Sequence, residues 1–281
     1  MSLTTSLADR IAATSPAPGS VATWWLGGSG FVFKTSSGQQ IWIDPYLSNV
    51  VQTIFGVGRA FPAPITVAEA APDIVVSTHW HEDHLDPGSI PELARHRPAA
   101  KFVMPPSAMA RALSWGVPRT QVVPFRLAET LEFGEVRLTG IFARHEISTA
   151  GWEVPDALGV LLDFNGVRIF HSGDTEYDAR IHRAVAPIPL ALATICINGS
   201  GGNMNAYEAA LLASQLNVRS LVPQHHSIWA KEPEAGETLD PRLFEETYYR
   251  LAGTANVHLP IVGGGWTITV QGEMTAMQEL S

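Results

Sequence analysis

Short apolar runs separated by turns recur along most of the chain. Val21–Leu26, Phe31–Lys34 and Gln40–Ile43 are rich in β-branched and aromatic residues, and turns containing glycine or serine separate them, which predicts a β-meander. Further strands are predicted at residues 73–78, 101–104, 121–123, 136–142, 159–164, 167–171, 220–223 and 266–270, and helices at residues 91–96, 106–115, 206–215 and 241–251. Because strands and helices occur in both halves, the pattern favours an α/β fold with two sheets covered by helices.

The first twenty residues differ from the rest of the chain. They are mostly polar and end in Pro16, Pro18 and Gly19, which predicts a short N-terminal arm over residues 1–20. No linker rich in proline and serine divides residues 21–281, so we expect these residues to form a single domain. Within it, Ser48–Pro64 contains several glycines and prolines and predicts a long loop of the kind that is commonly functional.

Composition and charge exclude several classes of protein. A chain with 46% hydrophobic and 16% charged residues is not disordered. The net charge is −9 and no basic run is present, so neither a nucleic acid nor a membrane surface is an expected partner. No signal-peptide core or membrane-spanning stretch is found, which favours a cytoplasmic protein. The only cysteine, Cys196, cannot form an intrachain disulfide and lies in an apolar run that predicts burial.

One segment concentrates side chains that bind metals. His79–His84 (HWHEDH) follows directly after the strand predicted at residues 73–78. Alternate side chains of a strand point the same way, so His79 and His81 are expected on one side, and a following helical turn would return Asp83 to the same point. Imidazole and carboxylate together suit divalent ions such as zinc, manganese or iron. A polar turn with incidental histidines explains this density poorly.

Three later strands are also followed by candidate ligands. His145, Asp174 and His225 each come shortly after a predicted strand. Taken singly, each residue is a weak indication, because a lone histidine is more often structural and an aspartate after glycine is more often a turn residue. Their joint occurrence in this order at strand ends favours a shared metal site.

The order of these residues resembles the metallo-β-lactamase superfamily, and the resemblance covers nearly the whole chain. It consists of His-x-His-x-Asp-His, a later His, an Asp in Gly-Asp-Thr and a final His. Ile41–Ser48 is similar to an early strand of that superfamily that ends in a structural aspartate, here Asp44. Other stretches resemble the L-ascorbate-6-phosphate lactonase family, namely Trp24-Trp25-Leu26-Gly27, Trp115-Gly116-Val117-Pro118, His171-Ser172-Gly173-Asp174, Pro223-x-His225-His226-x-Ile228-Trp229 and Val262-Gly263-Gly264.

The resemblance implies a fold and a set of metal ligands. The fold is the αββα sandwich, with two mixed β-sheets flanked by helices and the metals at the edge between the sheets. Two divalent ions are implied, and Mn2+ and Zn2+ are both compatible with the ligand types. The implied ligands are His79, His81 and His145 for one ion, Asp83, His84 and His225 for the other, and Asp174 as a bridge between them.

A binuclear site of this kind is expected to convert a bridging water into hydroxide and to stabilise the oxyanion that develops. Asp83 and Asp174 would then be catalytic as well as metal-binding. The resemblance narrows the expected reaction to hydrolysis of a lactone derived from a polar sugar acid. His226, next to a ligand, is expected either to donate a proton and contact substrate or to point into the core. His171 is expected to support Asp174.

The expected substrate is a small anionic molecule that can carry a phosphate. Arg59 lies among apolar residues of Ser48–Pro64, and arginine suits bidentate contacts to phosphate or carboxylate. The net charge of −9 would otherwise repel such a substrate, which makes a local cation more necessary. The sequence leaves the oligomeric state open, and a homo-oligomer is compatible with it.

Three alternatives remain at this point. A phosphodiesterase or another ester hydrolase could use the same binuclear site. The di-iron oxidoreductase branch of this fold typically has a carboxylate where His81 stands and works with an attached flavin domain. A non-catalytic member would have lost its metal site, and the presence of all seven ligand types argues against it.

Overall fold

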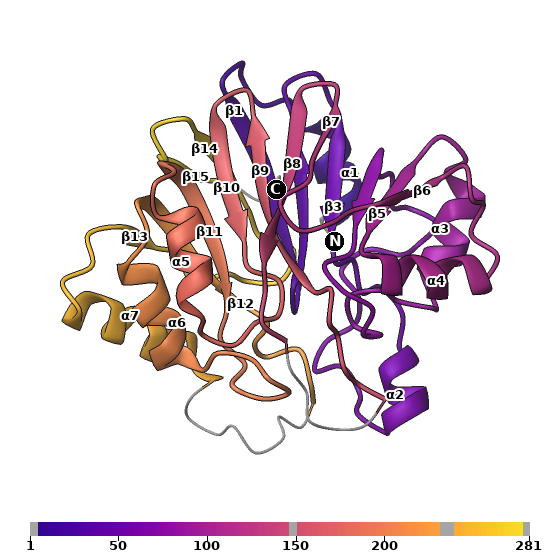
Figure 1. Cartoon of the computed structure of the whole chain (residues 1–281). Coiled ribbons are helices and arrows are strands. Elements are labelled where there is room, and N and C mark those ends of the chain that lie inside the picture. The colour runs from indigo at the N-terminus through magenta and orange to yellow at the C-terminus, as the bar shows by residue number, and fades with distance from the viewer. Residues whose placement is uncertain (1–4, 146–150, 231–238, 278–281) are drawn as a thin grey trace.

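The computed structural model describes residues 5–145, 151–230 and 239–277. Two β-sheets pack face to face, and helices cover both outer sides (Figure 1). The eight-stranded sheet has the strand order β15-β14-β1-β2-β3-β4-β5-β6, and the seven-stranded sheet has the order β13-β12-β11-β10-β9-β8-β7. The αββα sandwich expected from the sequence is therefore confirmed.

The first sheet consists of β1 (Ser20–Gly27), β2 (Gly30–Lys34), β3 (Gln40–Ile43), β4 (Ile74–Val76), β5 (Lys101–Met104), β6 (Val122–Pro124), β14 (Gly265–Thr269) and β15 (Met274–Ala276). The second consists of β7 (Thr130–Phe133), β8 (Val136–Phe142), β9 (Leu158–Phe164), β10 (Val167–His171), β11 (Leu190–Cys196), β12 (Val218–Gln224) and β13 (Asn256–Val257). The helices are α1 (Leu7–Ala13), α2 (Val50–Phe55), α3 (Ile90–His96), α4 (Pro106–Ser114), α5 (Ala179–Val185), α6 (Ala206–Ser214) and α7 (Pro241–Arg250).

Successive residues of the strands face different layers of the core. In β1, Trp24 packs in the cluster under α1, α3 and α4, whereas Trp25 belongs to the cluster between the two sheets. In β11, Leu192 faces the other sheet and Ala193 faces α5, α6 and α7. This period of two explains why the central strands are buried on both faces and read as nearly continuous apolar runs.

The parallel part of each sheet places strand ends at one edge. Strands β3 to β6 are parallel to one another, and so are β10 to β13, while β8 and β10 are both antiparallel to β9. The carboxyl ends of β8, β10 and β12 therefore lie at the same edge of the second sheet. Each of these strands precedes a candidate ligand, as does β4 in the first sheet.

Part of the predicted N-terminal arm is instead a helix packed on the first sheet. Leu7 and Ile11 of α1 are 5% and 2% exposed, and the Nζ atom of Lys34 donates hydrogen bonds to the carbonyls of Ile11 and Ala12. Ser6 caps the helix by accepting a hydrogen bond from the Asp9 amide. Two apolar residues spaced four apart provide a sufficient buried stripe for so short a helix. Tertiary packing, which composition does not show, stabilises it.

Other elements also depart from the sequence-based expectation. The segment Ser48–Pro64, predicted as a loop, contains α2. Strands β7 and β11 and helix α5 were not predicted. The apolar run of β11 (LALATIC) carries no alternation because both of its faces are buried, so periodicity could not identify it.

Two properties expected from the sequence can be compared with the described residues. Cys196 is fully buried at the end of β11, as its apolar surroundings predicted. Within residues 5–145, 151–230 and 239–277, every helix is too short or too polar to cross a lipid bilayer.

A buried carboxylate fixes the segment that follows the metal-binding motif. Asp86 is 0% exposed and accepts hydrogen bonds from the backbone amides of Leu47, Ser48 and Gly88, at 2.8–3.0 Å. The hydroxyls of Ser48 and Ser89 also donate to it. These contacts tie the chain after β3 to the chain after β4, directly beside His79–His84.

Replacement of this carboxylate should destabilise the protein markedly. We expect Asp86→Ala to lower the free energy of unfolding by about 3 kcal/mol, because buried amides lose a charged acceptor and gain no replacement. Denaturant titration followed by circular dichroism measures this change. Glu92→Ala on the exposed face of α3 is the control, with an expected change within about 0.5 kcal/mol. Equal effects of the two substitutions would contradict this role for Asp86.

Candidate metal centre

The candidate ligands come together at one edge of the sandwich. His79 to His84 follow β4 of the first sheet, where hydrogen bonds from the His84 and Leu85 amides to the His81 carbonyl form one helical turn. His145 follows β8, Asp174 follows β10 and His225 follows β12 of the second sheet. Both sheets thus contribute to one cluster, as the strand-end pattern predicted.

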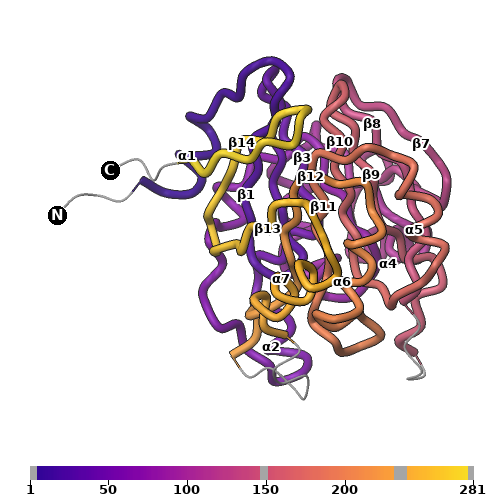
Figure 2. Tube along the Cα trace, turned by 90° about the vertical axis from the view of Figure 1, so that its left-hand side faces the viewer, coloured from indigo at the N-terminus to yellow at the C-terminus, as the bar shows by residue number. Residues whose placement is uncertain are grey.

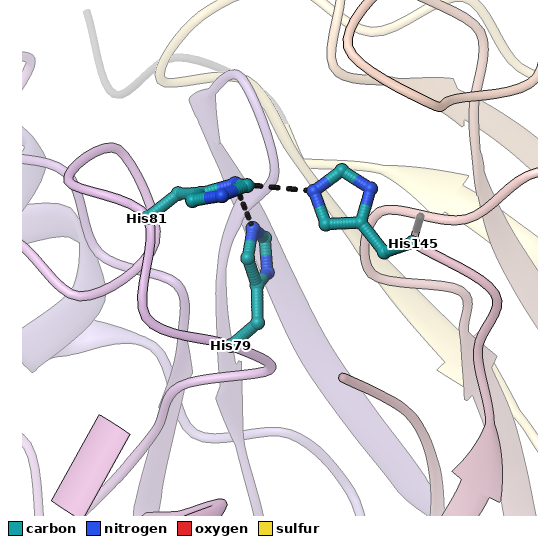
Figure 3. A group of neighbouring side chains, drawn as sticks. All are labelled: His79, His81 and His145. Carbon is teal, nitrogen blue, oxygen red and sulfur yellow. Dashed lines mark hydrogen bonds between the residues drawn. The ribbon is translucent and has the colours of Figure 1, made fainter. Parts of the chain in front are cut away.

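Three histidines form the first group (Figure 3). The Nδ1 atom of His81 lies 2.9 Å from Nε2 of His79 and 3.1 Å from Nε2 of His145. All three side chains are buried, and burial lowers the pKa of each, to about 4 for His81. Neutral imidazoles whose ring nitrogens converge in this way are suited to hold a metal ion.

A second group contains Asp83, His84 and His225. The Nε2 atoms of His84 and His225 lie 3.2 Å apart, and an oxygen of Asp83 lies 3.3 Å from the His225 nitrogen. Burial disfavours charge on the two histidines, but the carboxylates of Asp174 and Asp83 outweigh it and raise the pKa of both. This group too can hold a metal ion.

Asp174 lies between the two groups. Its Oδ2 atom is 3.3 Å from Nε2 of His84, 3.4 Å from Nε2 of His225 and 4.0 Å from Nε2 of His145. Its other oxygen, Oδ1, is buried and accepts no hydrogen bond from the described residues. A buried carboxylate oxygen without a donor is costly unless a cation satisfies it, so this position fits a metal ligand shared by both groups.

The imidazoles are oriented by oxygen atoms on their outer side. In His84, Nδ1 donates to Asp44, and in His81, Nε2 donates to the carbonyl of Trp152 at 3.3 Å. In His145, Nδ1 donates to the carbonyl of Gly202 at 3.3 Å. In His81 and His145, whose pKa is lowered, the bond fixes the proton on the nitrogen that faces away from the cluster and leaves the inner nitrogen with a free lone pair, whereas in His84 a metal ion would displace the proton that faces Asp174. The donor set therefore fits divalent metal ions.

Asp44 connects the two sheets behind the cluster. It is 0% exposed and accepts hydrogen bonds at 2.8 Å from the amide and the hydroxyl of Thr78 and from Nδ1 of His84. The Ser29 hydroxyl also donates to it, at 3.1 Å. Burial alone would raise the pKa of Asp44, but the neighbouring His84 and His171 hold it well below its ordinary value.

Sequence reasoning assigned the support of Asp174 to the wrong residue. His171 contacts the hydroxyls of Ser29 and Thr194 and lies 3.6 Å from Asp44, so it supports Asp44 instead. Asn203 is the residue that holds Asp174, because its Nδ2 atom donates to Oδ2 at 2.7 Å. Asn203 lies in a glycine-rich loop far along the chain, and no local pattern marks it.

A cavity of about 400 Å³ opens onto the cluster. His81, Asp83, His145, Asp174 and His225 contribute to its lining, whereas His79 and His84 lie beneath them and are fully buried. The remaining lining residues are Glu82, Trp229 and residues from α2 and the chain after it, from the segment around Trp152, and from the loop at residues 198–203. The site thus joins metal-binding side chains to a space of the size that small-molecule ligands occupy.

Comparison with known proteins gives the family. The β-lactamase superfamily domain matches residues 39–226, more than half of the chain. The chain belongs to the metallo-β-lactamase superfamily. A metal-dependent hydrolase, UPF0173, of Lysinibacillus sphaericus is 30% identical over 224 residues, which cover 78% of this chain and 89% of that protein. A Salmonella newport protein named as a probable L-ascorbate-6-phosphate lactonase is 24% identical over 265 residues. The match covers 80% of this chain and 74% of that protein.

Solved structures of the superfamily share the fold. Igni18, a metallo hydrolase of Ignicoccus hospitalis, superposes with a TM-score of 0.67 at 22% identity, over 88% of this chain and 98% of its own. CmlA, a di-iron β-hydroxylase of Streptomyces venezuelae, superposes with a TM-score of 0.65 at 16% identity, over 90% of this chain and 54% of its own. Within this superfamily, the chain is a metal-dependent hydrolase.

Arg59, predicted to contact substrate, binds the loop in which it lies through Nε and Nη1, while its buried Nη2 atom has no hydrogen-bond partner among the described residues. Its guanidinium donates to the carbonyls of Tyr46 at 2.7 Å and Phe61 at 3.2 Å and lies over both aromatic rings. Its backbone pairs with Trp229, and it is not among the residues that line the cavity. The predicted loop folds back around this arginine, because the buried carbonyls of its turns need a donor. The sequence shows the positive charge of Arg59 but does not show which carbonyls need a hydrogen-bond donor.

His226 is also displaced from its predicted role. Its ring packs against Trp25 at 5.0 Å between centroids, its Nδ1 atom lies 3.1 Å from the Ser227 hydroxyl, and it does not line the cavity. His225 has a left-handed backbone with φ 59°, and its amide donates to the Gly28 carbonyl. This turn directs the two neighbouring imidazoles apart. Of the two positions expected for His226, the structure shows the core.

The hydrogen bond from His84 to Asp44 should control metal affinity. We expect Asp44→Asn to weaken metal binding about 10- to 100-fold, because an amide no longer fixes the proton on the outer nitrogen of His84. Competition with a chromophoric chelator measures the affinity. Asp163→Asn makes the same change in a carboxylate that pairs with Arg137 and Arg168 on the second sheet, and it should leave the affinity unchanged. Unchanged affinity in both variants would contradict this role.

Proposed function

We propose that the protein hydrolyses a lactone or a related ester of a small molecule at a centre of two divalent ions, Mn2+ or Zn2+. The observation that carries the proposal is the convergence of seven imidazole and carboxylate side chains beside one cavity. His79, His81 and His145 would hold one ion, Asp83, His84 and His225 the other, and Asp174 would contact both.

Two divalent ions held by these residues would supply hydroxide from water near neutral pH and would polarise the carbonyl of the substrate. The chain's own residues prepare the site for this chemistry. Asn203 fixes the carboxylate of Asp174, and the carbonyls behind His81 and His145 keep the inner nitrogens of these two imidazoles free of protons. The side chain of Asp83 is 19% exposed, against 6% for Asp174, so it is the carboxylate within reach of a bound substrate. We assign proton transfer at the leaving group to Asp83.

The choice of a lactone or ester is supported by the similarity to the Salmonella relative and by segments that resemble the lactonase family, such as Trp115-Gly116-Val117-Pro118. A phosphodiester could use the same ions, so it forms one arm of the test below. The di-iron branch is less well supported. His81 is one of three clustered imidazoles and stands at the position where that branch typically has a carboxylate.

Metal analysis and a substrate panel test this function. Protein purified and loaded with Mn2+ or Zn2+ should hold about two ions per chain. It should hydrolyse lactones or aryl esters faster than bis(aryl) phosphodiesters, and removal of the ions by a chelator should abolish turnover. Faster phosphodiester cleavage would favour the rival hydrolase, and absence of hydrolysis with both ions bound would contradict the proposal.

Asp174, which lies between the two groups of candidate ligands, should be needed for full metal content. We expect Asp174→Asn to reduce the bound metal below two ions per chain and to lower hydrolysis about 10²- to 10³-fold or more. His226→Ala is the matched comparison, because His226 adjoins a ligand but packs on Trp25, and it should retain both ions. Metal content, measured by elemental analysis, decides the assignment. Equal losses of metal in the two variants would mean that Asp174 is not shared between the ions.

A further inference from the structure

The cavity beside the metal centre has a continuous apolar side. Val51, Val57 and Trp229 line it and belong to one packed cluster, and Phe55 and Trp152 extend this side, with their rings 5.1 Å apart. Helix α2, which carries Val51 and Phe55, projects at the lower edge of the sandwich (Figures 1 and 2). Phe55 is 42% exposed, so apolar surface remains open to water beside the cavity.

This apolar side begins at the metal ligands themselves. The Trp152 ring lies 5.3 Å from the ring of His81, and the Trp152 carbonyl accepts the His81 Nε2 hydrogen bond. The geometry therefore places Trp152 next to the reacting bond and Phe55 farther out. A group attached to the reacting carbonyl on this side would pass along Trp152 before it reaches Phe55.

The part of the lining that the structure describes offers no cation to an anionic group placed away from the metal centre. None of the cavity's described lining residues is a lysine or an arginine, and Glu82 adds a carboxylate to those of Asp83 and Asp174. Arg59, the cation predicted to serve here, is bonded to backbone carbonyls instead. A phosphate or carboxylate placed against the apolar side would lose hydration without gaining a partner.

We propose that the substrate is uncharged away from the bond that is cleaved and carries an aliphatic or aromatic tail that lies against Trp152 and Phe55. The inference rests on the proposed function, because the tail is positioned relative to the reacting bond. It replaces the phosphorylated sugar acid expected from the sequence with a neutral, apolar ester or lactone. Burial of the tail against Phe55 would contribute binding free energy that increases with its length.

Binding of simple amides tests the inference without requiring turnover. The metal-loaded full chain is titrated with acetamide, butanamide and hexanamide, and with 6-amino-6-oxohexanoate, in which a carboxylate replaces the terminal methyl group of hexanamide. Tryptophan fluorescence, or calorimetry where the signal is small, gives Kd. We expect hexanamide to bind about tenfold more tightly than butanamide, at roughly threefold per added methylene, and the anion to bind at least about tenfold more weakly than hexanamide.

Two neighbouring residues of α2 provide matched variants. Phe55→Ala should weaken hexanamide binding about fivefold and leave acetamide binding unchanged, because only the longer tail reaches Phe55. Ile54→Ala removes a side chain that is 50% exposed on the same helix but does not line the cavity, so it should change neither Kd. Circular dichroism confirms that both variants are folded.

The outcomes separate this inference from the proposed hydrolysis. Anion binding as tight as that of hexanamide, no dependence on tail length, or no measurable binding of any amide would overturn the inference. A tail-length dependence that is lost in Phe55→Ala, in a protein that hydrolyses none of the esters or lactones in the panel, would support it while contradicting the proposed function. Hydrolysis of an anionic lactone in preference to its neutral analogue would support the function and contradict the inference.

Discussion

The hydrogen bonds around Asp44 are the interaction on which the site depends. This fully buried carboxylate accepts hydrogen bonds from the amide and the hydroxyl of Thr78, which follows β4, and from Nδ1 of His84 in the next turn. Ser29, which donates to it, also contacts His171 of the second sheet. The Asp44 side chain is therefore linked to the second sheet, directly at 3.6 Å from His171 and through Ser29, at the edge where the candidate ligands converge. It also sets the protonation of a ligand, so fold and chemistry share one constraint.

Burial of this cluster lowers the stability of the folded chain, because five imidazoles and several carboxylates lose their hydration. Two features reduce this cost. The histidines of the first group are neutral because burial lowers their pKa, and the second group pairs His84 and His225 with acidic neighbours. Metal ions that bind the folded state would stabilise it further by mass action. Loss of one ligand should therefore affect folding as well as metal content.

The sequence predicted the architecture and the convergence of the candidate ligands, because both depend on local patterns. An apolar strand followed by a ligand is visible along the chain, and His79–His84 places three imidazoles within a few residues. The supporting contacts could not be predicted in this way. Asn203 reaches Asp174 only through the fold, and the position of Arg59 depends on which carbonyls the loop buries. Net charge, used to infer an anionic substrate, is a property of the whole surface and does not specify the lining of one cavity.

The candidate ligands and the apolar side of the cavity are positioned by different parts of the fold. The ligands follow central strands that are buried on both faces, so their positions are fixed by the core of both sheets. The apolar side of the cavity comes from α2 and the segment around Trp152, which connect elements at the surface. Changes in those segments should alter what the cavity accepts more than they alter the cluster, and the contact of Trp152 with His81 joins the apolar side directly to a candidate ligand. A shared metal centre therefore does not imply a shared substrate.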